Sequence, residues 1–136
     1  MTAIAYSDHR FPPCPTVRVR FSYTLEPERK VVAALDTGAD RTVVPISLLR
    51  EAGAWETRRS TSCVGYDGLR RHWSIYRVNV RILEPRWPEG VAPEFTDLEV
   101  FGVPDDEGKV DVLLGRDILA AWHLHLDGPN ARYRVE

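Results

Sequence analysis

The strongest chemical signal in the sequence is an aspartate that ends an apolar segment. Asp36 directly follows residues 30–35 (KVVAAL), and Thr37 and Gly38 come next. A carboxylate beside a buried strand loses its hydration unless hydrogen-bond donors replace the water, so its presence there favours a functional role. Gly38 allows the backbone to turn tightly and to bring amide groups close to the Asp36 side chain. Asp36 is therefore the leading candidate for a catalytic carboxylate.

A second segment, residues 110–119, strengthens this interpretation. On its own, the Asp-Thr-Gly triplet would also fit a turn that merely ends a strand, because aspartate and glycine are common in turns. In the second segment an apolar strand (VDVLL) runs into Gly115, after which Arg116 and Asp117 open a short helix. This segment alone would fit an ordinary strand–helix junction. The two segments together, in this order, are more specific than either one.

Together the two segments resemble a known protein family. The sequences ALDTGAD (34–40) and VLLGRDIL (112–119) are similar to the paired motifs of the retropepsin-like aspartic peptidases. That family includes the retroviral proteases and cellular relatives of the DNA-damage-inducible type. The resemblance extends over about residues 16–135, and it implies an all-β fold: a closed retropepsin-like barrel with one or two short helices, working as a two-fold homodimer. The implied activity is that of an aspartic endopeptidase.

The resemblance also implies roles for the residues that match the first motif. Asp36 is the catalytic aspartate, the Thr37 hydroxyl bonds to the twin loop of the second subunit, and the Gly38 carbonyl contacts the substrate. A glycine-containing hairpin at residues 64–69 lies where the family has its flap. The residues expected to bind substrate, in the loop and at the hairpin tip, are Ala39, Asp40, Gly65 and Tyr66.

The second motif is implied to support the first. Gly115, Arg116 and Asp117 are expected to pack beneath the catalytic loop, with Arg116 paired to Asp40. Arg41 departs from the viral members, which carry a second acid at this position.

The chemistry of aspartic peptidases requires two carboxyl groups about 3 Å apart that share one proton. The sequence contains a single Asp-Thr-Gly, because Asp67-Gly68 and Asp127-Gly128 lack the intervening hydroxyl residue. We therefore expect the second carboxylate to come from another copy of the chain, on a two-fold axis. The expected partners are a second subunit and a peptide or protein substrate. No cofactor and no metal ion are implied.

Alternating apolar residues predict the strands that would position this site. Tyr76, Val78 and Val80 alternate with polar residues, which is typical of a half-buried strand. We expect strands at residues 16–24, 30–35, 42–45, 58–63, 73–83, 96–103, 110–114, 123–127 and 132–135, and short helices at 46–52 and 116–122. These elements fit an all-β barrel or sandwich, closed so that the strand edges are protected.

Length and composition narrow the class of protein. The 136 residues suggest one domain, at residues 16–136, after a flexible N-terminal leader at residues 1–15. A formal net charge of −2 gives no reason to expect nucleic acid as a partner, and no apolar run is long enough to span a membrane. Cys14 and Cys63 form no CxxC pair, so we expect reduced thiols and a cytoplasmic protein. His123 and His125 alternate but lack further ligands at metal-binding spacing.

Two other interpretations remain open. The same fold would also suit a non-catalytic dimerisation or peptide-binding module, although the intact triplet at Asp36 argues against complete loss of activity. An unrelated small β-barrel that carries the motifs by chance would be a monomer.

Overall fold

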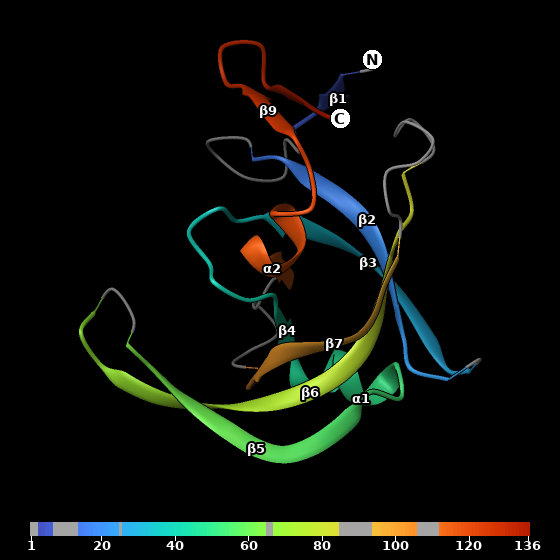
Figure 1. The fold of residues 1–136 in the computed structure, drawn as a ribbon, viewed down its shortest axis with the longest axis vertical. Coiled ribbons are helices and arrows are strands. Elements are labelled where there is room, and N and C mark those ends of the chain that lie inside the picture. Colours follow the sequence, from blue (N-terminus) through green and yellow to red (C-terminus); the bar gives the residue numbers. More distant parts are fainter. Residues whose placement is uncertain (1–2, 7–13, 25, 65–66, 85–93, 106–111) are drawn as a thin grey trace.

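Among the residues that the structure describes, the regular elements are mostly β-strands, with two short helices (Figure 1). The structure is a computed structural model that describes residues 3–6, 14–24, 26–64, 67–84, 94–105 and 112–136. The larger sheet contains β2 (Thr16–Ser22), β3 (Glu28–Leu35), β4 (Val43–Pro45), β5 (Trp55–Val64), β6 (Arg70–Ile82), β7 (Glu94–Val103) and β8 (Val112–Leu114). The smaller sheet contains β1 (Ile4–Ala5), β9 (Leu124–Asp127) and β10 (Arg132–Val135), and the helices are α1 (Ile46–Glu51) and α2 (Arg116–Leu119).

The larger sheet closes on itself. Its strand order is β2-β3-β8-β4-β7-β6-β5, and β2 also pairs with β6. Val19 to Ser22 of β2 lie antiparallel to Asn79 to Ile82 of β6, which completes a barrel of six strands. Strand β5 stays outside this ring, and among the described strands it pairs with β6 alone. The predicted all-β closed barrel with two short helices is therefore confirmed.

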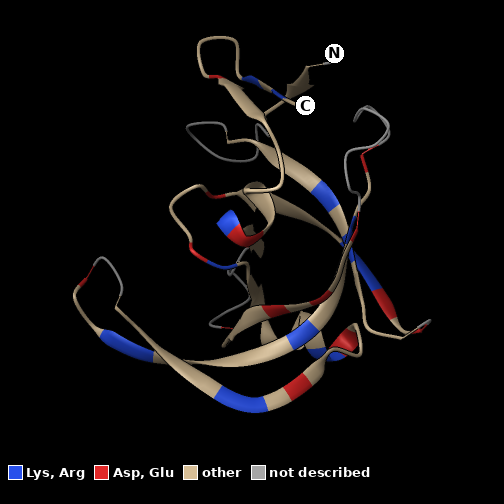
Figure 2. Ribbon diagram, in the orientation of Figure 1, with Lys and Arg blue, Asp and Glu red and all other residues tan. Residues whose placement is uncertain are grey.

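The interior of the barrel follows the period-two pattern of the sequence. Val17, Val19 and Phe21 of β2 are buried, and so are Tyr76 and Val78 of β6. The residues between them, Arg18, Arg20 and Arg77, are basic, and Figure 2 marks both basic and acidic positions on the ribbon of the outer strands. Burial of one face of each strand supplies the main driving force for closure, since apolar area is removed from water.

The smaller sheet joins the two ends of the chain (Figure 1). Ile4 and Ala5 pair with Tyr133 and Arg132 of β10, and Ile4 is almost fully buried. The Tyr6 amide also donates a hydrogen bond to the Ala131 carbonyl at 2.7 Å. Part of the expected leader is thus a strand. Two residues are too few to show a periodic pattern in the sequence, so only the tertiary pairing reveals β1.

The hairpin of β5 and β6 is longer than its apolar pattern predicts. Both strands begin three residues before the expected start, because cross-strand pairing continues through polar residues from Trp55–Arg77 to Val64–Arg70. A bulge interrupts the pairing between Glu56 and Ser60, and Arg58 within it has φ of 62°. Helix α2, in contrast, ends at Leu119, three residues earlier than expected. No helix among the described residues is both long and apolar enough to cross a lipid bilayer.

Candidate active site

The backbone of the barrel holds Asp36 at the end of β3. Strand β3 runs parallel to β8, and the ladder continues one residue further because the Asp36 amide donates to the Leu114 carbonyl at 2.9 Å. The Gly38 amide then donates to Oδ1 of Asp36 at 2.9 Å. A Cβ at Gly38 would lie 3.3 Å from the same oxygen, so a side chain there would crowd the carboxylate. The close approach of amide to carboxylate that the sequence suggested is therefore present.

The second motif packs directly against this loop. The Arg116 amide donates to the Ala39 carbonyl at 2.8 Å. A Cβ at Gly115 would lie 2.5 Å from the carbonyl carbon of Arg41 and 2.7 Å from its oxygen. The backbone of Gly115 has φ of −90° and ψ of −174°, which other residues adopt readily, so glycine is required here by space alone. The two motifs therefore form one structural unit, as the resemblance implied.

A buried threonine, Thr42, links the two motifs through hydrogen bonds. Thr42 is fully buried, and its hydroxyl donates to Asp117 Oδ1 at 2.9 Å while its amide donates to Oδ2 at 2.9 Å. The Gly115 amide donates to Thr42 Oγ1 at 3.2 Å, and the Ile118 amide donates to Asp117 Oδ1 at 2.9 Å. Thr42 was not among the residues singled out from the sequence, although this hydroxyl residue directly precedes the apolar run Val43-Val44-Pro45. Its role is structural: it satisfies buried donors that would otherwise be costly.

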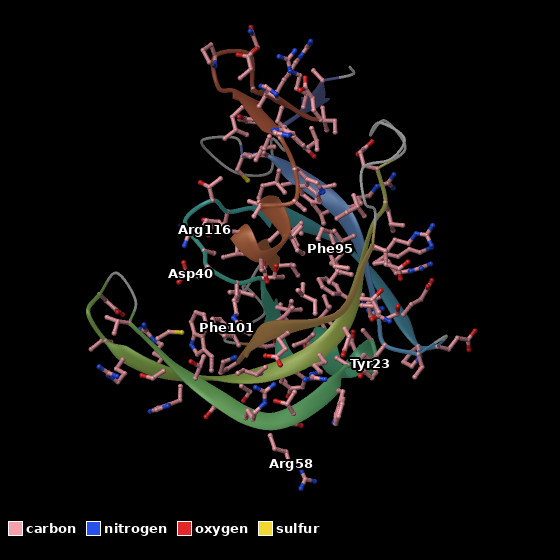
Figure 3. All side chains as sticks on the ribbon, viewed as in Figure 1. Tyr23, Asp40, Arg58, Phe95, Phe101 and Arg116 are labelled. Atoms are coloured by element: carbon pink, nitrogen blue, oxygen red, sulfur yellow. The ribbon has the colours of Figure 1, made fainter. Side chains whose placement is uncertain are left out.

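An ion pair joins the loop to α2 at the rim of the site. Arg116 is bonded to Asp40, as expected, and their side chains are 57% and 80% exposed. Figure 3 shows the two side chains next to one another beside α2. Exposed ion pairs of this kind contribute little to the free energy of unfolding, so the main effect expected of this pair is on the orientation of the Asp40 side chain.

The loop forms one wall of an open recess of about 500 Å³. The described residues that line it are Asp36, Gly38, Ala39, Asp40, Arg41, Val43, Cys63, Val64, Trp73, Phe101 and Leu113. Four predicted site residues thus meet in one place. Thr37 is exposed and outside this lining, and its bond to a twin loop stays a prediction. Gly65 and Tyr66 lie outside the described residues.

Aromatic side chains from β6 and β7 also line the recess. Trp73 of β6 and Phe101 of β7 meet edge to face, with ring centroids 5.7 Å apart. The Arg41 guanidinium lies over the Phe101 ring, 5.6 Å from its centroid. Neither Trp73 nor Phe101 was among the residues singled out from the sequence. Their odd-numbered positions, on the strand face opposite Tyr76 and Val100, were the signal that could have found them.

Arg41 also touches a charged cluster around Glu99. The Glu99 carboxylate accepts from Arg59 at 2.5 Å, and from Arg41 and Arg77 at 3.4 Å each. These contacts lower the pKa of Glu99, first through the hydrogen bond from Arg59 and then through the charges of Arg59 and Arg77 and the hydrogen bond from Arg41, against the opposing effect of desolvation. Arg77 also pairs with Asp97 at 3.3 Å.

The hairpin that the sequence places over the site is present up to its tip. Val64 pairs with Arg70, and Asp67 accepts hydrogen bonds from the Leu69 amide at 3.0 Å and from Arg71 at 2.5 and 3.2 Å. The Arg71 hydrogen bond is the largest cause of the lowered pKa of Asp67. Because Cys63 and Val64 also line the recess, the hairpin borders the same recess as Asp36.

Metal ligands do not gather at the site as far as the structure describes it. Across the described ranges, no group of three or more His, Cys, Asp or Glu side chains could hold a metal ion. His125 of β9 lies 3.6 Å from the Glu136 carboxylate, and neither residue is among those that line the recess.

Comparison with solved structures shows the fold. A retropepsin-like aspartic protease from Rickettsia conorii matches with a TM-score of 0.58 and 13% identity, over 98% of this chain and 88% of that chain. EIAV protease complexed with the inhibitor HBY-793 matches with a TM-score of 0.51 and 21% identity, over 86% of this chain and 92% of that chain. No family profile and no curated protein sequence matches the chain. The chain therefore has the retropepsin-like fold that its two motifs predict.

Proposed function

We propose that the protein is an aspartic endopeptidase in which two copies of the chain each contribute Asp36 to a single catalytic dyad. The observation that carries this proposal is the position of Asp36. Its amide is fixed by β8, its carboxylate is oriented by the Gly38 amide, and it faces a recess large enough for a peptide side chain. The retropepsin-like fold of the chain supports the same activity.

A second copy of the chain is needed to supply the second carboxyl group of the dyad. Besides Asp36, the carboxylate that lines the recess within the described residues is Asp40, and it is bonded to Arg116. A dyad needs two carboxyl groups about 3 Å apart, close enough that only one of them is ionised. A second Asp36 brought up on a two-fold axis would meet this requirement.

The proposed reaction is a hydrolysis in which the dyad moves two protons. One carboxylate takes a proton from a water molecule as its oxygen attacks the scissile carbonyl carbon, while the other carboxyl donates its proton to the carbonyl oxygen. The carboxyl that took the water proton then donates it to the amide nitrogen. As the C–N bond breaks, the other carboxylate takes a proton from a hydroxyl of the tetrahedral intermediate, so that an amine and a carboxylic acid leave and the dyad again carries one proton. In this scheme the Gly38 amide keeps Asp36 oriented throughout, because its hydrogen bond is to the carboxylate itself.

The test compares cleavage of casein and of a peptide library by the wild type and by Asp36→Asn. We expect cleavage by the wild type and a loss of at least about 10³-fold in Asp36→Asn, since the dyad supplies both proton transfers. Asp105→Asn is the matched control, because Asp105 is exposed, caps the Ser47 amide and is not among the residues of the recess. It should cleave like the wild type.

Two results would count against the proposal. Equal inertness of the wild type and Asp36→Asn, with both still forming dimers and binding peptide, would favour a non-catalytic binding module. Equal activity of the two would place the reaction elsewhere in the chain.

A further inference from the structure

We infer that Arg41 makes the recess selective for a substrate side chain that ends in a carboxylate, with glutamate as the preferred residue. This inference rests on the proposed function, because it concerns which peptides the same site accepts. Arg41 lines the recess, lies over the Phe101 ring, and has a side chain that is 43% exposed.

Arg41 is the basic residue among the described residues that line the recess. The acidic ones are Asp36 and Asp40, and the charge of Asp40 is compensated by Arg116. A carboxylate that enters beside Arg41 therefore meets one guanidinium that faces the recess. Guanidinium–carboxylate hydrogen bonds are about twice as strong as neutral ones, which gives the pairing its selectivity.

The ion pair that Arg41 already makes does not prevent this role. Glu99 is shared by three guanidiniums, and its contact with Arg59 is 0.9 Å shorter than its contact with Arg41 (2.5 against 3.4 Å). Arg77 contributes a third contact at 3.4 Å and also pairs with Asp97. The cluster thus holds three positive and two negative side chains. Release of Arg41 leaves Glu99 paired with two guanidiniums, so Arg41 is available to a ligand.

The walls of the recess favour glutamate over aspartate. The lining of the recess also includes Val43, Leu113 and the edge-to-face pair of Trp73 and Phe101, and the Arg41 guanidinium lies over the Phe101 ring. A side chain that packs on these apolar groups and also bonds to Arg41 needs methylene groups before its charge. Glutamate has two such groups and aspartate one, so glutamate covers more of the apolar wall while its carboxylate meets the guanidinium.

The experiment scans each position of a peptide with Glu, Gln, Asp and Leu, and it has two readouts. The first is kcat/KM for hydrolysis. The second is the Kd of the same peptides with the scissile bond replaced by a non-hydrolysable hydroxyethylene group, which reports binding without chemistry. We expect one position at which Glu exceeds Gln by about tenfold in both readouts, the ratio that one charge-assisted contact gives. Asp should fall below Glu at that position.

Three variants link this preference to Arg41. Arg41→Gln should reduce the Glu-to-Gln ratio to about one, and Arg41→Glu should favour Lys over Glu at the same position. Arg81→Gln is the matched control, since Arg81 is exposed on β6 and is not part of the recess, and it should keep the wild-type preference.

The outcomes separate this inference from the proposed function. Hydrolysis without a Glu preference, or with one that survives Arg41→Gln, overturns the inference and leaves the peptidase proposal standing. Binding with an Arg41-dependent Glu preference but no hydrolysis supports the inference and overturns the peptidase proposal. Neither binding nor hydrolysis of any peptide overturns both.

Discussion

Thr42 and Asp117 are joined by two hydrogen bonds of 2.9 Å across 75 positions of sequence. Thr42 follows the loop that carries Asp36, and Asp117 lies in the first turn of α2. Through these bonds, and through the contact of Gly115 with the Arg41 backbone, α2 is fixed beneath the candidate catalytic loop. The position of Asp36 thus depends on residues that are not themselves part of the recess.

Removal of this link should destabilise the protein. We expect Asp117→Ala to lower the free energy of unfolding by about 3 kcal/mol, because three donors lose a charged acceptor. Thr42→Val should lower it by about 1–3 kcal/mol, because the Gly115 amide and the Asp117 carboxylate each lose a partner. Urea denaturation measures both effects. Since the two residues share one network, the double variant should cost less than the sum of the single ones, and strict additivity would argue against direct coupling.

Crowding at Gly115 gives a second prediction, on activity as well as stability. In Gly115→Ala the new methyl group would meet backbone atoms of Arg41 and Ala39 at 2.5–2.9 Å, so the catalytic loop must move. We expect a loss of about 1–3 kcal/mol in the free energy of unfolding, typical of overpacking, together with loss of peptide cleavage. Gly128→Ala is the control, because a Cβ there meets no atom within 4 Å. Full cleavage activity in Gly115→Ala would show that the loop does not depend on α2.

The ion pair at the base of the hairpin tip predicts a titration. The Arg71 guanidinium and the Leu69 amide lower the pKa of Asp67 below its ordinary value of 3.8. A lowered pKa in the folded protein means that the pairing is present above the ordinary value and is lost as the pH falls through the lower one. The pairing should therefore be intact at pH 5–7 and weaken only below about pH 4. Carboxyl chemical shifts in an NMR titration report the midpoint of Asp67. In Arg71→Gln the midpoint should rise, and an unchanged midpoint would rule out the pair in solution.

Much of the fold was predictable because it rests on local patterns. The alternation in β2 and β6 and the turn residues between strands predicted an all-β barrel or sandwich, and burial of Phe21 and Val78 follows that pattern. The resemblance of the two motifs selected the closed barrel. The two motifs predicted which loop carries the carboxylate and which helix supports it. These features depend on residues close together in the sequence or on a resemblance that spans both motifs.

The recess was not predictable in the same way. Arg41, Trp73 and Phe101 come from three separate segments, and their meeting depends on the register of β6 against β7, which pairs Ile75 with Phe101. A shift of one residue would turn each side chain to the other face of its strand. The bulge at Arg58, which lies between the paired residues Glu56 and Ser60, similarly has no signal in the local pattern. Such contacts follow from tertiary pairing rather than from composition or periodicity.

The most direct test of the central claim is the activity of mixed subunits. Wild-type and Asp36→Asn chains are combined at constant total concentration, high enough for all subunits to pair, and peptide cleavage is measured against the wild-type fraction. If each site needs Asp36 from both chains, mixed dimers are inactive, and activity falls as the square of that fraction, to about one quarter in an equal mixture. Activity that falls in direct proportion, to about one half, would show that each chain acts alone and would contradict the shared dyad.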